Sequence, residues 1–494
     1  MEWKTLFRTK TIETSKETPD NSGNKLARTM GVLDITALGI GAIIGTGIFV
    51  LTGVAAAKYA GPAVVISFII SGVVAGLAAL AYAELASMVP VAGGAYTYTY
   101  ASLGEMIAWL IGWNLILEYI VAAGAVAIGW SSYLMDLLAS IGLAVPKAFA
   151  SSPFSGGIIN LPAIAIVLLI TWIAVLGVKH SAGATKIVVV VKLFVIALFI
   201  ALGVFRVDTG NWVPFTPFGF SGIIHGAAIV FFAYIGFDAV ATAAEEVKNP
   251  KRDLPRGIIA SLLVSTLLYV AVAGILTGML AYTRLNTPSP ITAALLATGI
   301  KWATAFISVG ALAGLTSVLL AVIFAQSRVF FAMARDGLLP PVFAKIHQKY
   351  KTPYLNTLMI GGMIAAIAAI FPVGLIAQMA NIGTLSALAV VSIGVIVLRK
   401  TKPDMERPFK LPFFPYLPIV ATGALIYLAI NLPTSTWIRF VVWIALGLVI
   451  YFTYGMKHSR LAGSNNVQPT VPGAQRAIFT FEVGELDEKS DGKG

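Results

Sequence analysis

Long apolar runs dominate this sequence and limit what it can fold into. A membrane-spanning helix needs about 20 mostly apolar residues to cross roughly 30 Å of hydrocarbon. Twelve runs approach that length, near residues 34–57, 62–88, 104–128, 159–177, 184–205, 220–244, 256–282, 302–332, 355–371, 373–397, 415–431 and 435–456. Because 58% of the 494 residues are apolar and only 11% are charged, a soluble chain would lack the polar surface to cover itself. We therefore expect an all-α polytopic membrane protein with twelve transmembrane helices.

Basic residues in the short loops predict the orientation of the chain. Loops rich in Lys and Arg remain on the cytoplasmic side of a membrane. With a cytoplasmic N-terminus most of these residues fall inside, and the outer loops hold Lys58, Lys147, Arg206, Arg284 and Lys301. Twelve spans return the chain to its starting side, so we expect both termini in the cytoplasm and the protein in the cell (plasma) membrane. The net charge of +12 fits this bias and anionic membrane lipids, and it predicts no nucleic-acid partner.

The polar ends and the counts of reactive residues exclude several classes of protein. Residues 1–32 are expected to be a cytoplasmic N-terminal segment without a removable signal peptide, and residues 457–494 a flexible cytoplasmic tail. The membrane domain is expected between them, over residues 33–456. The chain has no cysteine, and its four histidines are not clustered. We therefore expect no catalytic residues, no metal site and no cofactor, and we do not expect an enzyme.

The first apolar run contains four glycines in the sequence GIGAIIGTGIFV, residues 39–50. One explanation is packing, because Gly41 and Gly45 form a G-x-x-x-G pair that lets two membrane helices approach closely. The other is that the helix is broken near residues 44–47. A membrane tolerates such unpaired backbone only where it lines a cavity inside the protein. On this run alone the two explanations carry similar weight.

The sixth apolar run favours the broken helix. Its sequence IVFFAYIGFDAVA, residues 229–241, contains Gly236 and the acidic Asp238. If the chain consists of two halves of five helices, the first and sixth runs occupy corresponding positions. Paired glycine-interrupted spans in two halves indicate a transporter's substrate site. A bulky residue in place of Gly47 is therefore expected to abolish binding by entering the space that a ligand needs, while leaving the protein folded.

Four motifs in order along residues 25–456 resemble the amino acid–polyamine–organocation permeases. They are GIGAIIGTGIF, FFAYIGFDAVATAAEEVKNPKRDLPRGI, SRVFFAMARDGLLP and RPFKLP, and with LEY at 117–119 they are similar to the bacterial cationic amino acid transporter branch. This resemblance implies a LeuT-like fold with five-plus-five inverted repeats and broken helices 1 and 6. Repeat one would cover about 33–205 and repeat two about 220–397, followed by two extra helices at about 415–456.

The resemblance also implies a binding site for the head group of an L-amino acid. Backbone N–H groups would bind the carboxylate and backbone carbonyls the ammonium, because helix ends carry matching partial charges. The implied N–H donors are Thr46, Gly47 and Ile48, and the implied carbonyls are those of Ile43, Phe232, Ala233 and Ile235. The Phe232 ring could instead serve only in core packing. Val322, beside Ala321, would form an apolar wall for side chains, so we expect a broad carrier that takes small neutral as well as cationic amino acids.

Three ionisable residues lie deep in the apolar runs, namely Glu118, Lys192 and Asp238. Charges are costly at membrane depth, so such residues usually face a cavity and have a functional role. Glu118 is expected either to contact the polar end of the substrate or to make a structural hydrogen bond. Asp238 could take part in proton coupling or could cap the half-helix beside it.

Lys192 resembles the lysine that replaces a sodium ion in sodium-independent relatives of this architecture. A buried lysine can take up and release a proton, which would couple transport to a proton gradient. Alternatively, it is a fixed structural charge. We expect a secondary active amino acid transporter, sodium-independent and proton-coupled, that imports L-amino acids by alternating access. The open alternatives are an amino acid/polyamine exchanger and a non-transporting amino acid sensor.

Overall fold

The computed structural model describes residues 8–9, 30–88, 94–177, 182–238, 240, 247–350 and 352–460. Most of the expected N-terminal segment and residues 461–494 of the expected tail lie outside the described residues. The described chain is mainly helical, and its β pairing is limited to two isolated bridges, Met30 with Val247 and Ala150 with Asn160. The expectation of an all-helical protein is therefore confirmed for this part of the chain.

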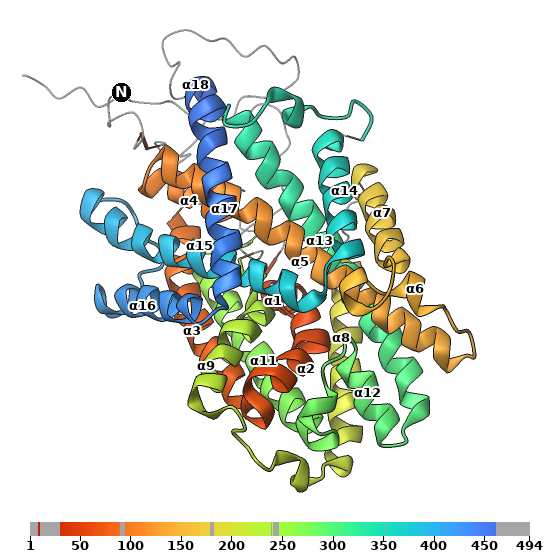
Figure 1. Ribbon diagram of the computed structural model, residues 1–494. Helices are drawn as coiled ribbons and strands as arrows, with labels where there is room; N and C mark the ends of the chain where they lie inside the picture. The colour runs from red at the N-terminus through yellow and green to blue at the C-terminus, as the bar shows by residue number, and fades with distance from the viewer. Residues whose placement is uncertain are drawn as a thin grey trace, which may run out of the picture.

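Helices occupy all twelve apolar runs (Figure 1). They are α1 (Val32–Ile43) with α2 (Thr52–Ala55), α3 (Val64–Met88), α5 (Glu105–Ser140), α7 (Leu161–Val175), α8 (Ala182–Gly203), α9 (Gly219–Val230), α11 (Pro250–Met279), α13 (Lys301–Arg335), α14 (Tyr354–Ile370), α15 (Val373–Thr401), α16 (Tyr416–Ile430) and α17 (Thr434–Ile450). By length and composition, seven helical stretches of the described chain can cross a membrane, and five further apolar helices are shorter. The protein is thus a multi-pass membrane protein.

Helix α5 forms the centre of the molecule (Figure 1). It packs against α13, α15 and α14, and its most apolar window is 89% buried. Helix α17 lies at the opposite extreme, with only 17% of its window buried. Its outward residues include Ile438, Val441 and Val442, each about 60% exposed, as lipid-facing side chains would be. The core therefore surrounds α5, and α17 covers its edge.

The two ends of the described chain meet at Glu105, a buried acid at the start of α5. The Glu105 backbone N–H donates to the Arg8 carbonyl at 3.0 Å. The Glu105 carboxylate accepts hydrogen bonds from the hydroxyls of Tyr100, Tyr451 and Ser459 at 3.0, 3.0 and 2.5 Å. Both ends therefore lie on the same face of the molecule. The short helices α4 (Gly94–Ser102) and α18 (Met456–His458) belong to this face as well (Figure 1).

A second buried carboxylate fixes the loop that carries the RPFKLP motif. Glu84, near the end of α3, is 1% exposed and accepts two hydrogen bonds from Arg399 of α15, at 2.8 and 2.5 Å. The Leu411 backbone N–H donates to the same carboxylate at 2.7 Å, and Arg407 lies 3.7 Å away. Bidentate pairs of this type fix geometry as well as energy. The loop between α15 and α16 is thereby held against α3.

We expect Glu84→Gln to lower the free energy of unfolding by about 3 kcal/mol, because it leaves the buried end of Arg399 without its counter-charge. The thermal unfolding midpoint in detergent measures the effect. Asp404→Asn, which changes an exposed acid of the same loop, is the matched control and should leave the midpoint in place. Equal midpoints for the two variants would show that the Glu84 pair does not stabilise the fold.

Candidate functional site

The first apolar run is broken in the middle. Helix α1 ends at Ile43, and Ile44 has an extended backbone with ψ 104°. A π-helical turn, η2 (Gly47–Leu51), begins after Thr46 and continues into α2 and η3 (Ala56–Ala60). The expected break at residues 44–47 is therefore present. It separates α1, which we call the inner piece, from η2, α2 and η3, which together we call the outer piece.

The sixth apolar run is broken as well. Helix α9 tightens into the 3₁₀ turn η8 (Phe231–Tyr234), and Ile235 leaves it with an extended backbone, ψ 136°. Gly236 follows with φ +111°, a conformation that favours glycine. A Cβ on Gly236 would also lie 2.8 Å from the Ala42 carbonyl oxygen of the first break. Gly236 therefore allows both the chain reversal and the close contact between the two breaks.

The glycines of the first run serve contacts with several different partners. A Cβ on Gly47 would lie 2.3 Å from the Cβ and 2.4 Å from the Cα of Ala233, in the second break. Gly41 faces Val189 of α8 at 2.7 Å, and Gly45 faces Val318 of α13 at 3.2 Å. Both explanations of these glycines thus apply in part. The helix is broken, and the G-x-x-x-G pair packs closely, but against two helices rather than one.

A cavity lies between the two breaks, α5 and α13. Its lining includes Ile43, Thr46, Gly47, Phe232, Ile235 and Asp238 from the breaks, Tyr119, Ala122 and Val126 from α5, and Val318, Ala321 and Val322 from α13. The Thr46 hydroxyl is buried and has no hydrogen-bond partner among the described residues. Because the first N–H groups of a helix also lack intrahelical acceptors, the start of η2 can bind an anionic group.

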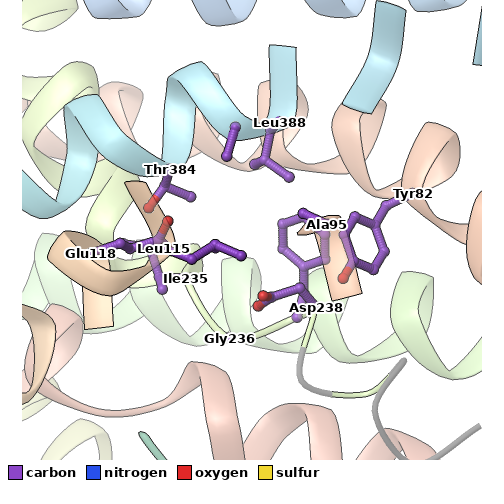
Figure 2. A pocket seen from close by; sticks show the side chains of 11 residues that line it. Tyr82, Ala95, Leu115, Glu118, Ile235, Gly236, Asp238, Thr384 and Leu388 are labelled. Atoms are coloured by element: carbon purple, nitrogen blue, oxygen red, sulfur yellow. The ribbon is translucent and has the colours of Figure 1, made fainter. Parts of the chain in front are cut away.

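Not all of the expected site residues line this cavity. Ile48 and Ala233 are fully buried behind it, and Ala233 forms the contact with Gly47 described above. Glu118 lines a smaller neighbouring cavity with Tyr82 and Thr384 (Figure 2). One Glu118 carboxylate oxygen, Oε2, has no hydrogen-bond partner among the described residues. Seven of the eleven expected residues therefore line the larger cavity, and Ile48, Ala233, Glu118 and Lys192 do not.

Asp238 connects the two cavities. It lines both of them and accepts a hydrogen bond from the Tyr119 hydroxyl at 3.2 Å. In Figure 2 it lies across the smaller cavity from Glu118. Both acidic side chains therefore line the smaller cavity, and Asp238 also lines the larger one.

Lys192 lies behind the first break rather than in the cavity. Its fully buried ammonium donates to the carbonyl oxygens of Gly41 and Ile44, at 2.7 and 3.1 Å. These carbonyls belong to the end of α1, where the break leaves them without helical donors. The lysine stem runs beside Gly314 of α13, where a Cβ would lie 3.0 Å from it. Lys192 therefore joins α8 to the broken end of α1.

Tyr269 is a site residue that the sequence did not single out. It is fully buried on α11, and its hydroxyl lies 2.7 Å from the Ala233 carbonyl oxygen and 2.9 Å from that of Ile43. One hydroxyl proton thus serves one carbonyl from each break. A single tyrosine in an apolar run resembles a core residue, so only the tertiary contacts reveal its position between the breaks.

A family model described as amino acid permease matches residues 30–460. The chain belongs to this family, within the amino acid–polyamine–organocation superfamily. The resemblance found in the four motifs is therefore confirmed. The match includes both breaks and all the helices that surround the cavity. The family is one of transporters, and this chain is a permease rather than an enzyme.

The permease is similar over most of its length to proteins with different named substrates. It is 49% identical over 458 residues to a methylthioribose transporter of Bacillus subtilis (strain 168), covering 92% of this chain and 99% of that protein. It is 48% identical over 446 residues to the branched-chain amino acid permease BcaP of the same organism, covering 89% and 96%. A vacuolar cationic amino acid transporter 4 of Arabidopsis thaliana is 38% identical over 406 residues, covering 81% and 68%.

The contact at Gly47 changes the expected effect of substitutions in the permease. A side chain at position 47 would meet the Ala233 backbone, not a ligand in the cavity, so we expect even Gly47→Ala to force the two breaks apart and lower the unfolding midpoint. Gly45→Ala is the matched control, because its Cβ would meet only the Val318 side chain, at 3.2 Å. Adding Ala233→Gly should not rescue Gly47→Ala, since the clashing Cα remains. Equal midpoints for the two single variants would contradict this geometry.

Proposed function

We propose that this permease is a secondary active transporter of L-amino acids that works by alternating access. The observation that supports it most is the pair of facing breaks around a cavity. Each break leaves backbone groups unpaired, and a membrane protein tolerates them where a ligand or water can bind. An amino acid head group carries one anion and one cation, which matches a site of N–H donors on one side and carbonyls on the other.

In the proposed site the carboxylate binds the N–H groups at Thr46 and Gly47, with the Thr46 hydroxyl as a further donor. The ammonium binds the carbonyl of Ile235 and shares that of Phe232, which already accepts from the Ile235 N–H at 3.2 Å; both residues line the cavity. The carbonyls of Ile43 and Ala233 are already within reach of Tyr269, so the ammonium shares them at most. Ile48 supports the turn from behind, and Glu118 acts from the neighbouring cavity.

The proposed architecture is the LeuT-like inverted repeat. Helices α1 to α8 would form the first repeat, and α9 to α15 the second, with α16 and α17 as the two extra helices. This division is supported by the positions of the breaks, because α1 and α9 each begin a series of five apolar runs. The face with the chain ends would be cytoplasmic, as the basic loops predict, and the membrane would be the plasma membrane.

Proposed coupling rests on Lys192 and uses protons rather than sodium. Its ammonium holds two carbonyls at the end of α1, a place where a bound cation could otherwise lie. If the lysine loses its proton, the neutral amine keeps two N–H donors, but the favourable charge at a helix C-terminus is lost and both hydrogen bonds weaken. The inner piece of the first run would then move more easily relative to α8. Asp238, at the second break, is proposed to exchange the proton with the cavity.

The apolar wall supports a broad preference for neutral side chains. Ala122, Val126, Ala321 and Val322 offer no charge to a basic side chain. Asp238, the one acid among the described residues that line this cavity, accepts a hydrogen bond from Tyr119. The name of the branched-chain amino acid permease agrees with such a wall. The name of the cationic amino acid transporter is the reason to test basic amino acids as well. The name of the methylthioribose transporter makes a neutral thiosugar the second candidate substrate.

Competition for uptake into proteoliposomes tests the substrate class. We expect unlabelled alanine, leucine and other neutral amino acids to inhibit uptake of labelled alanine, with weaker inhibition by lysine and arginine. Methylthioribose, which has neither the carboxylate nor the ammonium, should not compete. Inhibition by methylthioribose alone, or by basic amino acids alone, would overturn the proposed substrate class. Substrate binding without uptake would instead identify a sensor.

Imposed ion gradients test the role of Lys192. We expect an inward proton gradient to drive accumulation of alanine above equilibrium and a sodium gradient to have no effect. Lys192→Ala should lose the gradient-driven part, and Lys192→Arg should keep a positive charge but no usable titration. Exchange of internal for external alanine needs no net proton movement and serves as the control for folding. Sodium dependence, or undiminished accumulation in Lys192→Ala, would remove this lysine from the coupling mechanism.

A further inference from the structure

Helix α12 (Pro290–Ala297) covers the outer piece of the broken first run. A Cβ on Gly53, in α2, would lie 2.5 Å from both the Leu285 carbonyl oxygen and the Pro290 side chain. The inner side of α12 is buried, with Ala294 and Leu295 at 0% exposure. In Figure 1 α12 lies at the lower right, far from α18 at the top. On this face the outer piece is therefore covered by α12.

A partly buried polar cluster connects α12 to the far end of α5. The Thr292 hydroxyl, fully buried, donates a short hydrogen bond to the Asp136 carboxylate. The Ser289 hydroxyl also bonds Asp136, and the Ser132 hydroxyl donates to Ser289 at 3.0 Å. Apart from this cluster, the buried side of α12 is apolar. Apolar packing is not directional, whereas hydrogen bonds to a carboxylate hold one geometry.

The same end of α5 also holds the outer piece itself. Tyr133, three residues before Asp136 and so on the same side of the helix, donates to the Phe49 carbonyl oxygen in η2 at 2.7 Å. One helix end thus binds the outer piece through Tyr133 and its cover through Asp136. Opening of the cavity toward this face requires the outer piece and α12 to separate from α5.

We propose that Asp136 is a positioning residue that holds α12 closed over the outer piece and sets how often the cavity opens toward this face. The inference rests on the alternating access proposed above, but it concerns the closure and not the substrate. The Thr292 hydroxyl needs only an acceptor oxygen at position 136, so this contact does not depend on the protonation of Asp136. Removal of the acceptor should let α12 separate from α5 more often. A neutral side chain that keeps an acceptor oxygen should hold α12 in place.

Cysteine labelling measures the closure directly, because the native chain contains no cysteine. Ala294→Cys places one thiol on the buried side of α12, where a maleimide reacts only when α12 lifts. In detergent we expect Asp136→Ala to speed this labelling about tenfold, the factor that corresponds to losing a hydrogen bond to a charged group. Thr292→Val should do the same, the double variant should add little, and Asp136→Asn should stay near the parent rate.

Two controls separate closure from general loosening of the protein. Thr298→Val removes a hydroxyl that bonds only to carbonyls of α12 itself, and it should leave the labelling rate unchanged. A thiol at the other end of α5, from Ala108→Cys at a fully buried position, should not label faster in Asp136→Ala. Unchanged labelling at position 294 in Asp136→Ala, or equal acceleration at both positions, would overturn the proposal. If closure responds as expected but alanine is not transported, only the proposed function fails.

Discussion

Unpaired backbone inside an apolar protein is the constraint on which the rest of this structure depends. Two helices stop in mid-run, and each carbonyl or N–H left without a partner costs several kcal/mol in such surroundings, about 2–7 by transfer measurements. Two buried side chains remove part of that cost. The Lys192 ammonium takes the carbonyls of Gly41 and Ile44, and the Tyr269 hydroxyl serves Ile43 and Ala233. Thr46, Gly47 and Ile235 of the breaks line the cavity, where a ligand could supply partners for their backbone groups.

The same constraint explains why the breaks are rich in glycine. Tyr269 reaches both breaks only because they are in direct contact, and that contact leaves no room for a Cβ at Gly47 or Gly236. The glycines therefore do not simply weaken a helix. They allow two unwound segments to lie so close that one hydroxyl can serve both, which fixes the two sides of the cavity relative to each other. Pre-organisation of this type lowers the ordering cost that a small substrate would otherwise meet on binding.

The sequence was informative wherever one residue in an apolar run has a strong local effect. Twelve runs, two glycine-marked breaks and a lysine at membrane depth were all visible, because each departs from what a lipid-facing helix tolerates. The contacts between runs were not visible. The direction of a Cβ from Gly47, the separation of Glu118 from the main cavity and the position of Tyr269 depend on how helices distant in sequence pack. Hydrophobic and small residues carry little information about their partners.

Helix α5 shows how one scaffold can serve both faces. Its 36 residues extend over roughly 50 Å, well beyond the roughly 30 Å of hydrocarbon, so its two ends reach the polar regions even when the helix is tilted. Each end carries an acid, the buried Glu105 with the ends of the described chain and the half-buried Asp136 with α12. The middle carries Glu118 and the cavity wall. Because the carboxylates bind different elements at the two ends, contacts on one face can break while those on the other persist. The alternating access proposed above could use such a helix, which stays in place while its partners exchange contacts.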